Sequence, residues 1–278
     1  MSQATKYNNV RAWTGRLCMP LAMSVLVLLC ACDNIAEDDR LIYEAPAAVN
    51  RSVLIEDFTG QRCVNCPNAA DEIHSLQQEY GDSIVVAVAI HGGPMAVKPN
   101  PARPNVVGLA TDLGDAYHEH WKVEQWPMGM VNRSGICQYT DWKSRVREQI
   151  ALKAPVNITA TFSDVDGQPT VGVETMGLAA LADAKLQVWL VEDSIIATQL
   201  MPDGKANAQY LHRHVFRAAV NGEWGTDLSV AEGQVVTSSF PVTLSEVWQR
   251  NRLAAVVFVY DDSGVLQVTS APLAIGQE

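Results

Sequence analysis

Apolar residues between positions 51 and 153 follow a pattern typical of a strand–helix–strand unit. The run Ser52–Phe58 is short and mostly apolar, and the run Ile84–Ile90 is continuously apolar, as in a central parallel strand. Between them, apolar residues recur at spacings of three or four over Asn68–Tyr80, which predicts an amphipathic helix. Two more helices are predicted downstream, over Val106–Lys122 and over Asp141–Lys153, with Asp141 as the N-cap.

The second half of the chain has a different pattern. Apolar and polar residues alternate over Val156–Phe162, which indicates a half-buried strand. One short helix is predicted over Leu244–Asn251, and the other segments favour strands with turn residues between them. These further strand-like runs are Thr170–Glu174, Lys185–Glu192, Tyr210–Val220, Val235–Val242, Leu253–Tyr260 and Val265–Ser270. Many short strands of this kind predict an all-β immunoglobulin-like sandwich domain over residues 154–278.

The first apolar run, Leu17–Ala31, is about 15 residues long, too short for a membrane-spanning helix and typical of a signal-peptide core. It ends in Leu29-Cys30-Ala31-Cys32, which resembles the lipobox of bacterial lipoproteins. We therefore predict a signal peptide over 1–31, an acylated Cys32 that anchors the chain in the lipid bilayer, and a polar tether over 32–50. A simple membrane anchor or a buried helix is the alternative, although the acidic residues after Cys32 favour processing.

Three cysteines remain after the predicted processing site: Cys63, Cys66 and Cys137. Cys63 and Cys66 form a C-x-x-C pair between the first strand and its helix, which is the context of a redox motif. A closed zinc site needs four ligands, and no second C-x-x-C is present. Cys137 is interpreted as a small buried side chain.

The order of landmarks around the C-x-x-C pair resembles that of thioredoxin-like proteins. Asp57-Phe58 end the first strand six residues before Cys63, and Trp126-Pro127 precede the later strand-like run, at the place where thioredoxins have a cis proline. The resemblance implies an α/β thioredoxin-like domain over 51–153. It also implies that Asp57 lies buried beneath the cysteines and moves protons to and from Cys66, and that Pro127 is cis and presents backbone to an extended substrate.

Two interpretations of the C-x-x-C pair stay open. The helix dipole and unpaired N–H groups at the start of the helix favour the Cys63 thiolate as the nucleophile, with Cys66 resolving a mixed disulfide. The partners of such an exchange would be exported protein or peptide thiols. Alternatively, the pair is a structural disulfide, and burial of Cys63 under the 92–105 segment would favour that interpretation.

Composition and histidine positions narrow the remaining classes of function. The net charge is −11, and no basic patch or nucleic-acid motif is present, so no nucleic acid is expected as a partner. His118 and His120 are expected on the surface, and His212 and His214 on a solvated sheet face. His91 ends a strand near the cysteines. No cofactor or metal site is predicted.

The mature chain as a whole resembles exported lipoproteins of the twenty-eight-kilodalton outer membrane protein family. The matching stretches are Glu56–Gly60 through Cys66-Pro67, Tyr210–Trp224 and Val256–Tyr260. The resemblance implies a lipid-anchored protein of the outer membrane, on its periplasmic or cell-surface face. Two functions follow as hypotheses: a thiol–disulfide oxidoreductase that uses the C-x-x-C pair, or a non-enzymatic surface or periplasmic binding protein.

Overall fold

The computed structural model describes residues 47–165 and 167–274. The predicted signal peptide 1–31, the predicted lipid anchor Cys32 and most of the predicted tether 32–50 lie outside these residues. Within the described ranges, no helix has the length and apolar character needed to cross a membrane.

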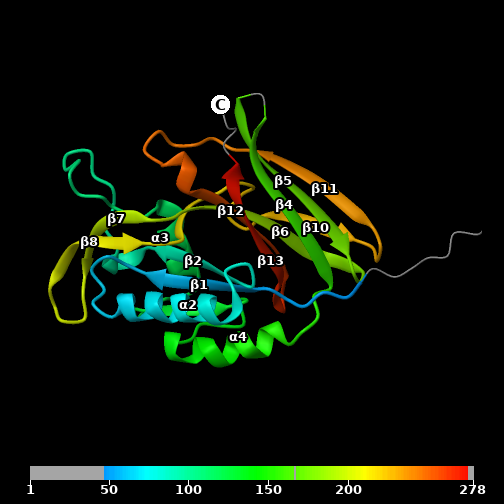
Figure 1. Cartoon of the computed structure of the whole chain (residues 1–278), viewed down its shortest axis with the longest axis horizontal. Helices are drawn as coiled ribbons and strands as arrows, with labels where there is room; N and C mark the ends of the chain where they lie inside the picture. The colour runs from blue at the N-terminus through cyan, green and yellow to red at the C-terminus, as the bar shows by residue number, and fades with distance from the viewer. Residues whose placement is uncertain (1–46, 166, 275–278) are drawn as a thin grey trace, which may run out of the picture. The chain divides into compact units, whose positions relative to one another are not determined.

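A parallel strand pair joined by a helix begins the described chain (Figure 1). Strand β1 (Val53–Thr59) pairs in parallel with β2 (Val85–His91), and α2 (Cys66–Tyr80) connects them. Strand β3 (Met128–Val131) adds antiparallel to the other edge of β1. All residues of β1 and β2 are buried, because other elements cover both faces of the pair.

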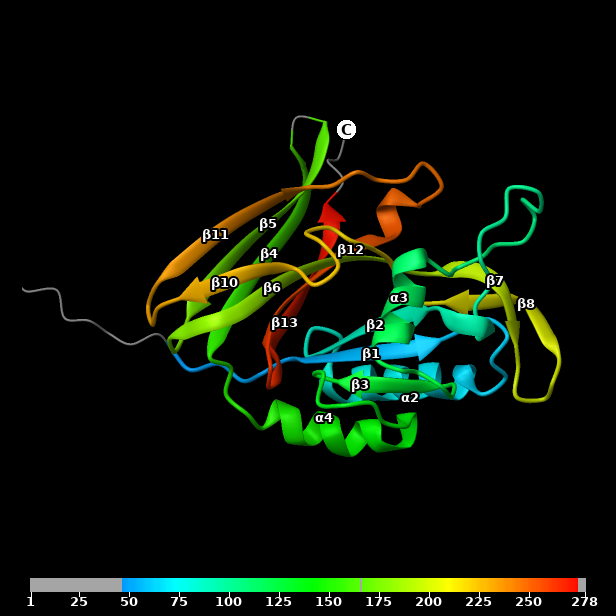
Figure 2. The ribbon, with the colours of Figure 1, turned by 180° about the vertical axis from the view of Figure 1, so that it is seen from behind.

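Helices lie on opposite faces of these strands (Figure 2). Helices α2 and α4 (Trp142–Ile150) pack on one face, and α3 (Asp112–His120) packs on the other. Because side chains alternate along a strand, Val53 and Ile55 contribute to the core beneath α2 and α4. Leu54 belongs to the opposite core, which contains Tyr117 of α3.

The remaining elements are mostly strands. They are β4 (Val156–Val165), β5 (Gln168–Gly177), β6 (Leu181–Glu192), β7 (Ile195–Leu200), β8 (Ala206–His212), β9 (Val215–Ala219), β10 (Thr226–Val230), β11 (Val235–Pro241), β12 (Leu253–Asp261) and β13 (Gly264–Ala274), with short 3-10 turns η2 (Gly93–Met95), η3 (Tyr139–Asp141) and η4 (Arg250–Arg252). Strands β7 and β8 form a separate two-stranded sheet.

A single mixed sheet of 11 strands runs through both halves of the chain. Its order is β11-β5-β4-β13-β12-β6-β9-β2-β1-β3, with β10 paired to β6. Strand β9 makes the join, because it pairs with β6 on one side and, at Val215, with Ala89 of β2 on the other. The prediction of an α/β thioredoxin-like domain followed by an all-β immunoglobulin-like sandwich is therefore wrong.

The physical reason for this difference lies in the central strands β6 and β12. Ala255 and Val257 of β12 belong to the core formed with β4 and β5, whereas Val256 and Phe258 belong to the core formed with β1, β2 and α3. Each of these strands thus has two apolar faces. A sandwich that stood apart from the first half would leave one of those faces in water.

Two local predictions in the second half also differ from the structure. The predicted strand Tyr210–Val220 is divided into β8 and β9 at His214, whose backbone has a positive φ of 55°. The predicted helix Leu244–Asn251 is absent, and only the short turn η4 follows at Arg250–Arg252.

A buried ion pair between Glu56 and Arg133 lies where the two halves of the chain meet. The guanidinium Nε donates to both carboxylate oxygens of Glu56, at 3.3 and 3.2 Å, and the two side chains are 1% and 4% exposed. Five aromatic rings surround the guanidinium carbon, with centroids between 4.4 and 5.9 Å away. These rings belong to Trp121, Trp189, Trp224, Phe258 and Tyr260.

Replacing Arg133 with methionine will strongly destabilise the fold. The Arg133→Met change leaves the Glu56 carboxylate buried without a partner, which costs about 3–5 kcal/mol of unfolding free energy. Urea denaturation measures this loss, and the exposed Arg103→Met variant is the control, with an expected change within about 0.5 kcal/mol. Adding Glu56→Gln to Arg133→Met recovers part of the loss. Equal urea midpoints for Arg133→Met and the wild type would contradict this account.

Candidate functional site

Cys63 and Cys66 form a disulfide at the point where β1 passes into α2. Their Cα atoms are 5.4 Å apart, and Cys66 is the first residue of the helix. Pro67 occupies the first turn of α2, where its missing N–H has no intrahelical acceptor to lose. The two cysteines are only 4% and 3% exposed, so the disulfide is shielded from solvent.

Strand β7 covers the cysteine loop through the side chain of Gln199. Its Nε2 donates to the carbonyls of Cys63, at 2.8 Å, and Gly60, at 3.3 Å. The Gln199 side chain is 2% exposed. A strand from the second half of the chain therefore holds the backbone of the C-x-x-C loop in place.

A second glutamine, Gln61, joins the same loop to two other segments. Its side chain donates to the carbonyls of Val107 and Thr198 and accepts from the N–H of Leu109. The segment after β2 also contacts this loop, since the Arg62 N–H donates to the carbonyl of Met95. Sequence patterns did not single out Gln61 or Gln199, because their partners lie far away along the chain.

Asp57 lies on the α2 face of β1 and is 2% exposed. Its Oδ1 atom has no hydrogen-bond partner. Burial raises the pKa of Asp57 to about 8, because desolvation disfavours the charged carboxylate. The carboxyl group is therefore protonated at neutral pH.

The Trp126–Pro127 peptide bond is cis. Met128, the next residue, pairs with Phe58 of β1, so this bond lies at the end of β1 from which the cysteine loop departs. The structure thus brings Cys63, Cys66, Asp57 and Pro127 to the same end of one strand. The catalytic roles assigned to them stay a prediction.

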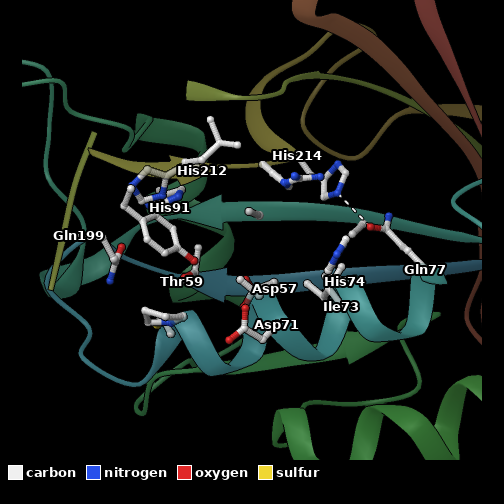
Figure 3. A pocket seen from close by; sticks show the side chains of 18 residues that line it. Asp57, Thr59, Asp71, Ile73, His74, Gln77, His91, Gln199, His212 and His214 are labelled. Atoms are coloured by element: carbon white, nitrogen blue, oxygen red, sulfur yellow. Dashed lines mark hydrogen bonds between the residues drawn. The ribbon is translucent and has the colours of Figure 1, made fainter. Parts of the chain in front are cut away.

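A pocket of about 290 Å³ opens between α2, the β1–β2 surface and the Tyr210–His214 segment (Figure 3). Cys66 and Asp57 line it, as do the buried histidines His91 and His212. The rings of these two histidines are 5.3 Å apart and meet edge to face. Burial lowers the pKa of His91 well below its usual value and lowers that of His212 to about 4, so both imidazoles are uncharged at neutral pH.

The other candidate residues have mainly packing roles. His118 is buried rather than on the surface, because its Nδ1 bonds to the Gly114 carbonyl and its ring stacks on Trp126. His120 is exposed. Cys137 is a buried free thiol, and burial raises its pKa. Among the described residues, no group of three or more His, Cys, Asp or Glu side chains is arranged to hold a metal ion.

The expectation of a solvated sheet face at His212 and His214 is wrong. His212 ends β8 and is 5% exposed. His214 lies in the bend before β9, and its Nε2 is 3.3 Å from the Gln77 side-chain oxygen. His214 thus contacts α2 and His212 packs on His91 of β2, and both line the pocket.

A solved structure with a similar fold covers most of the chain. HBP35 of Porphyromonas gingivalis is 16% identical, with a TM-score of 0.62 that covers 84% of this chain and 80% of that one. A domain of the outer membrane lipoprotein Omp28 from Porphyromonas gingivalis is 23% identical and covers 43% of this chain and 88% of that one, with a TM-score of 0.29. No curated protein matches the chain.

A family model described as outer membrane protein Omp28 matches residues 114–277. This match begins in α3 and includes β3 to β13, which is more than half of the chain. The predicted family and the predicted outer-membrane location are thereby confirmed. The chain belongs to the Omp28 family of outer membrane proteins.

Proposed function

We propose that this protein is a non-enzymatic binding protein of the outer membrane in which Cys63–Cys66 is a structural disulfide. The observation that carries this proposal is the burial of both cysteines, at 4% and 3% exposure. Thiol–disulfide exchange requires that an attacking thiolate reach a sulfur along the S–S axis, and access limits its rate. A shielded disulfide is a poor partner for that reaction.

Specific hydrogen bonds hold the cover over the disulfide in place. Two buried glutamines, Gln61 and Gln199, together make hydrogen bonds to backbone groups on the cysteine loop, β7 and the segment before α3. Opening the loop breaks these bonds and leaves buried polar groups without partners, at a cost of about 1–3 kcal/mol each. The disulfide in turn fixes the loop on which this cover rests.

Lipid anchoring at Cys32 completes the proposal. The lipobox-like sequence Leu29–Cys32 and the short apolar run before it support processing and acylation at this residue. Membership in an outer membrane family agrees with that route, and the Omp28 domain from Porphyromonas gingivalis is described as part of a lipoprotein. The acyl chains would then hold the protein at the bilayer.

A second candidate function, thiol–disulfide exchange, is favoured by Asp57. This carboxyl group lines the same pocket as Cys66 and has a pKa of about 8, which suits proton transfer to and from a thiol near neutral pH. In that reaction the Cys63 thiolate attacks a client disulfide and releases one client thiolate. Cys66 then attacks the mixed disulfide, releasing the second client thiolate and re-forming the Cys63–Cys66 bond.

Redox titration of the folded protein, read by alkylation and mass spectrometry, distinguishes the two candidates. We expect a reduction potential below about −300 mV, the range of structural disulfides, and not the exchange range of about −270 to −120 mV. Gln199→Ala will loosen the cover and speed reduction of the disulfide, whereas Gln209→Ala, an exposed glutamine on β8, will not. A wild-type potential in the exchange range would favour the oxidoreductase.

Removing the disulfide will reduce stability by a predictable amount. The Cys63→Ser/Cys66→Ser variant frees a very short loop, for which chain entropy gives about 2 kcal/mol of unfolding free energy. Chemical denaturation under oxidising conditions measures the loss. The same comparison under strong reductant is the control, because both proteins then lack the bond and their midpoints will converge. A variant as stable as the oxidised wild type would contradict a structural role.

Asp57→Asn will change the pH dependence of stability. In the folded protein Asp57 keeps its proton up to about pH 8, whereas an unfolded aspartate ionises near pH 4. The stability that this group contributes is therefore full below about pH 4 and is lost as the pH rises to about 8. The variant will gain stability relative to wild type over that range, and the difference will level off above it.

Urea midpoints at pH 5, 7 and 9 measure this difference. Asp71→Asn, an exposed carboxylate at the rim of the same pocket, is the control. A flat difference for Asp57→Asn would mean that the carboxyl group is ionised in the folded protein. If the variant also slows reduction of a client disulfide, the oxidoreductase gains support.

A further inference from the structure

We propose that the pocket between α2, the β1–β2 surface and the Tyr210–His214 segment binds a small uncharged organic molecule with a hydrogen-bond donor at one end and an apolar body. This inference deepens the proposed binding function and rests on it for its biological role. It stands on the geometry of three buried polar groups, on the size of the cavity and on the character of its walls.

Several residues that line this pocket have buried polar atoms without hydrogen-bond partners. Nine buried side-chain nitrogen or oxygen atoms among the described residues have no hydrogen-bond partner, and three of them belong to residues that line this one cavity. They are Oδ1 of Asp57, Nδ1 of His91 and Nε2 of His212, from β1, β2 and β8. Leaving such an atom unbonded is costly, so a ligand that bonds to it recovers that free energy.

The cavity is large enough for an organic molecule. Its volume is about 290 Å³. An apolar cavity of about 150 Å³ in another protein takes up benzene, so this pocket has room for a ring with substituents. Figure 3 shows His91 and His212 together at one end of the pocket and Gln77 and His214 at the other.

Protonation states define the polar end of the ligand. One ring nitrogen of His212 bonds to the Ala197 carbonyl, and because Nε2 is the unpartnered one, Nε2 is left as an acceptor in the neutral ring. The ligand must therefore offer an N–H or O–H donor there. Asp57 holds its proton at neutral pH and His91 is uncharged, so the buried end of the pocket has no charge to match a ligand ion.

The walls define the rest of the ligand. Ile73 and Ala70 of α2 and Ala87 and Ala89 of β2 line the pocket with apolar surface, and Leu211 of β8 is 40% exposed beside it. Burial of an apolar body against these side chains contributes roughly 25 cal/mol per Å². The charged side chains at the rim, Asp71 and Arg213, are exposed and need no partner from the ligand.

The test uses phenol as the probe, with the full chain purified in detergent. Phenol has one O–H donor on an apolar ring, toluene has the same shape without the donor, and benzoate has a charge in its place. Saturation-transfer NMR detects binding, and titration gives the Kd. We expect phenol to bind at least tenfold more tightly than either toluene or benzoate.

Two variants locate the site. His212→Phe keeps a ring but removes the Nε2 acceptor and will weaken phenol binding about tenfold, as expected for one lost buried hydrogen bond. His120→Phe makes the same change on an exposed residue outside the pocket and will leave binding unchanged. Ala70→Phe fills the pocket from the half-buried side of α2 and will abolish phenol binding. If His212→Phe does not fold, this variant shows whether phenol binds in this pocket.

Several outcomes would overturn the inference. The first is no detectable phenol binding at about 10 mM, which is tenfold above a Kd of about 1 mM. The second is toluene binding as tight as that of phenol, and the third is phenol binding to Ala70→Phe as tight as to wild type. Ordered water bridging Asp57, His91 and His212 in phenol-soaked crystals would also do so. None of these measurements reads the redox activity of the cysteines. An exchange-active disulfide together with phenol binding would therefore overturn the structural role of the disulfide and leave the proposed binding site supported.

Discussion

The Glu56–Arg133 ion pair is the constraint on which the arrangement of the chain depends. Two charges this deeply buried are tolerable only when each fully satisfies the other and the surroundings are polarisable. The carboxylate comes from β1 and the guanidinium from the turn after β3, but the enclosing rings come mainly from β6, the segment before β10, and β12. The first half of the chain therefore supplies the charges, and the second half supplies the environment that makes their burial possible.

Local features of the fold were predictable from the sequence, and long-range ones were not. Periodicity over Asn68–Tyr80 predicted α2 to within two residues, because an amphipathic helix is encoded by its own side chains. The apolar run in β12 also predicted a strand, but it does not say which elements cover each face. That ambiguity allowed the second half to be interpreted as a separate sandwich, whereas β12 and β6 serve two cores.

In the candidate site too, local features were predictable from the sequence and long-range contacts were not. The resemblance to thioredoxin-like proteins placed Cys63, Cys66, Asp57 and Pro127 near one another, and all four lie in or next to β1 or β3. The sequence did not predict the cover over the disulfide, because Gln199 and Cys63 are 136 residues apart and a single glutamine in a short strand has no signature of its own. The prediction for His212 and His214 was wrong for a related reason: the chain bends at His214, where φ is positive, and alternation along a strand does not predict such a bend.

The interleaving of β9 and β12 with the first half has a consequence for biogenesis. A chain is synthesised from its N-terminus, so Glu56 and Arg133 emerge well before Phe258 and Tyr260. Until Phe258 and Tyr260 emerge, the Glu56–Arg133 pair lacks two of the rings that enclose it. Strand β6 also lacks the β12 strand with which it pairs. Loss of β12 would therefore remove Phe258 and Tyr260 from around Arg133 and leave unpaired the edge of β6 that bonds to β12.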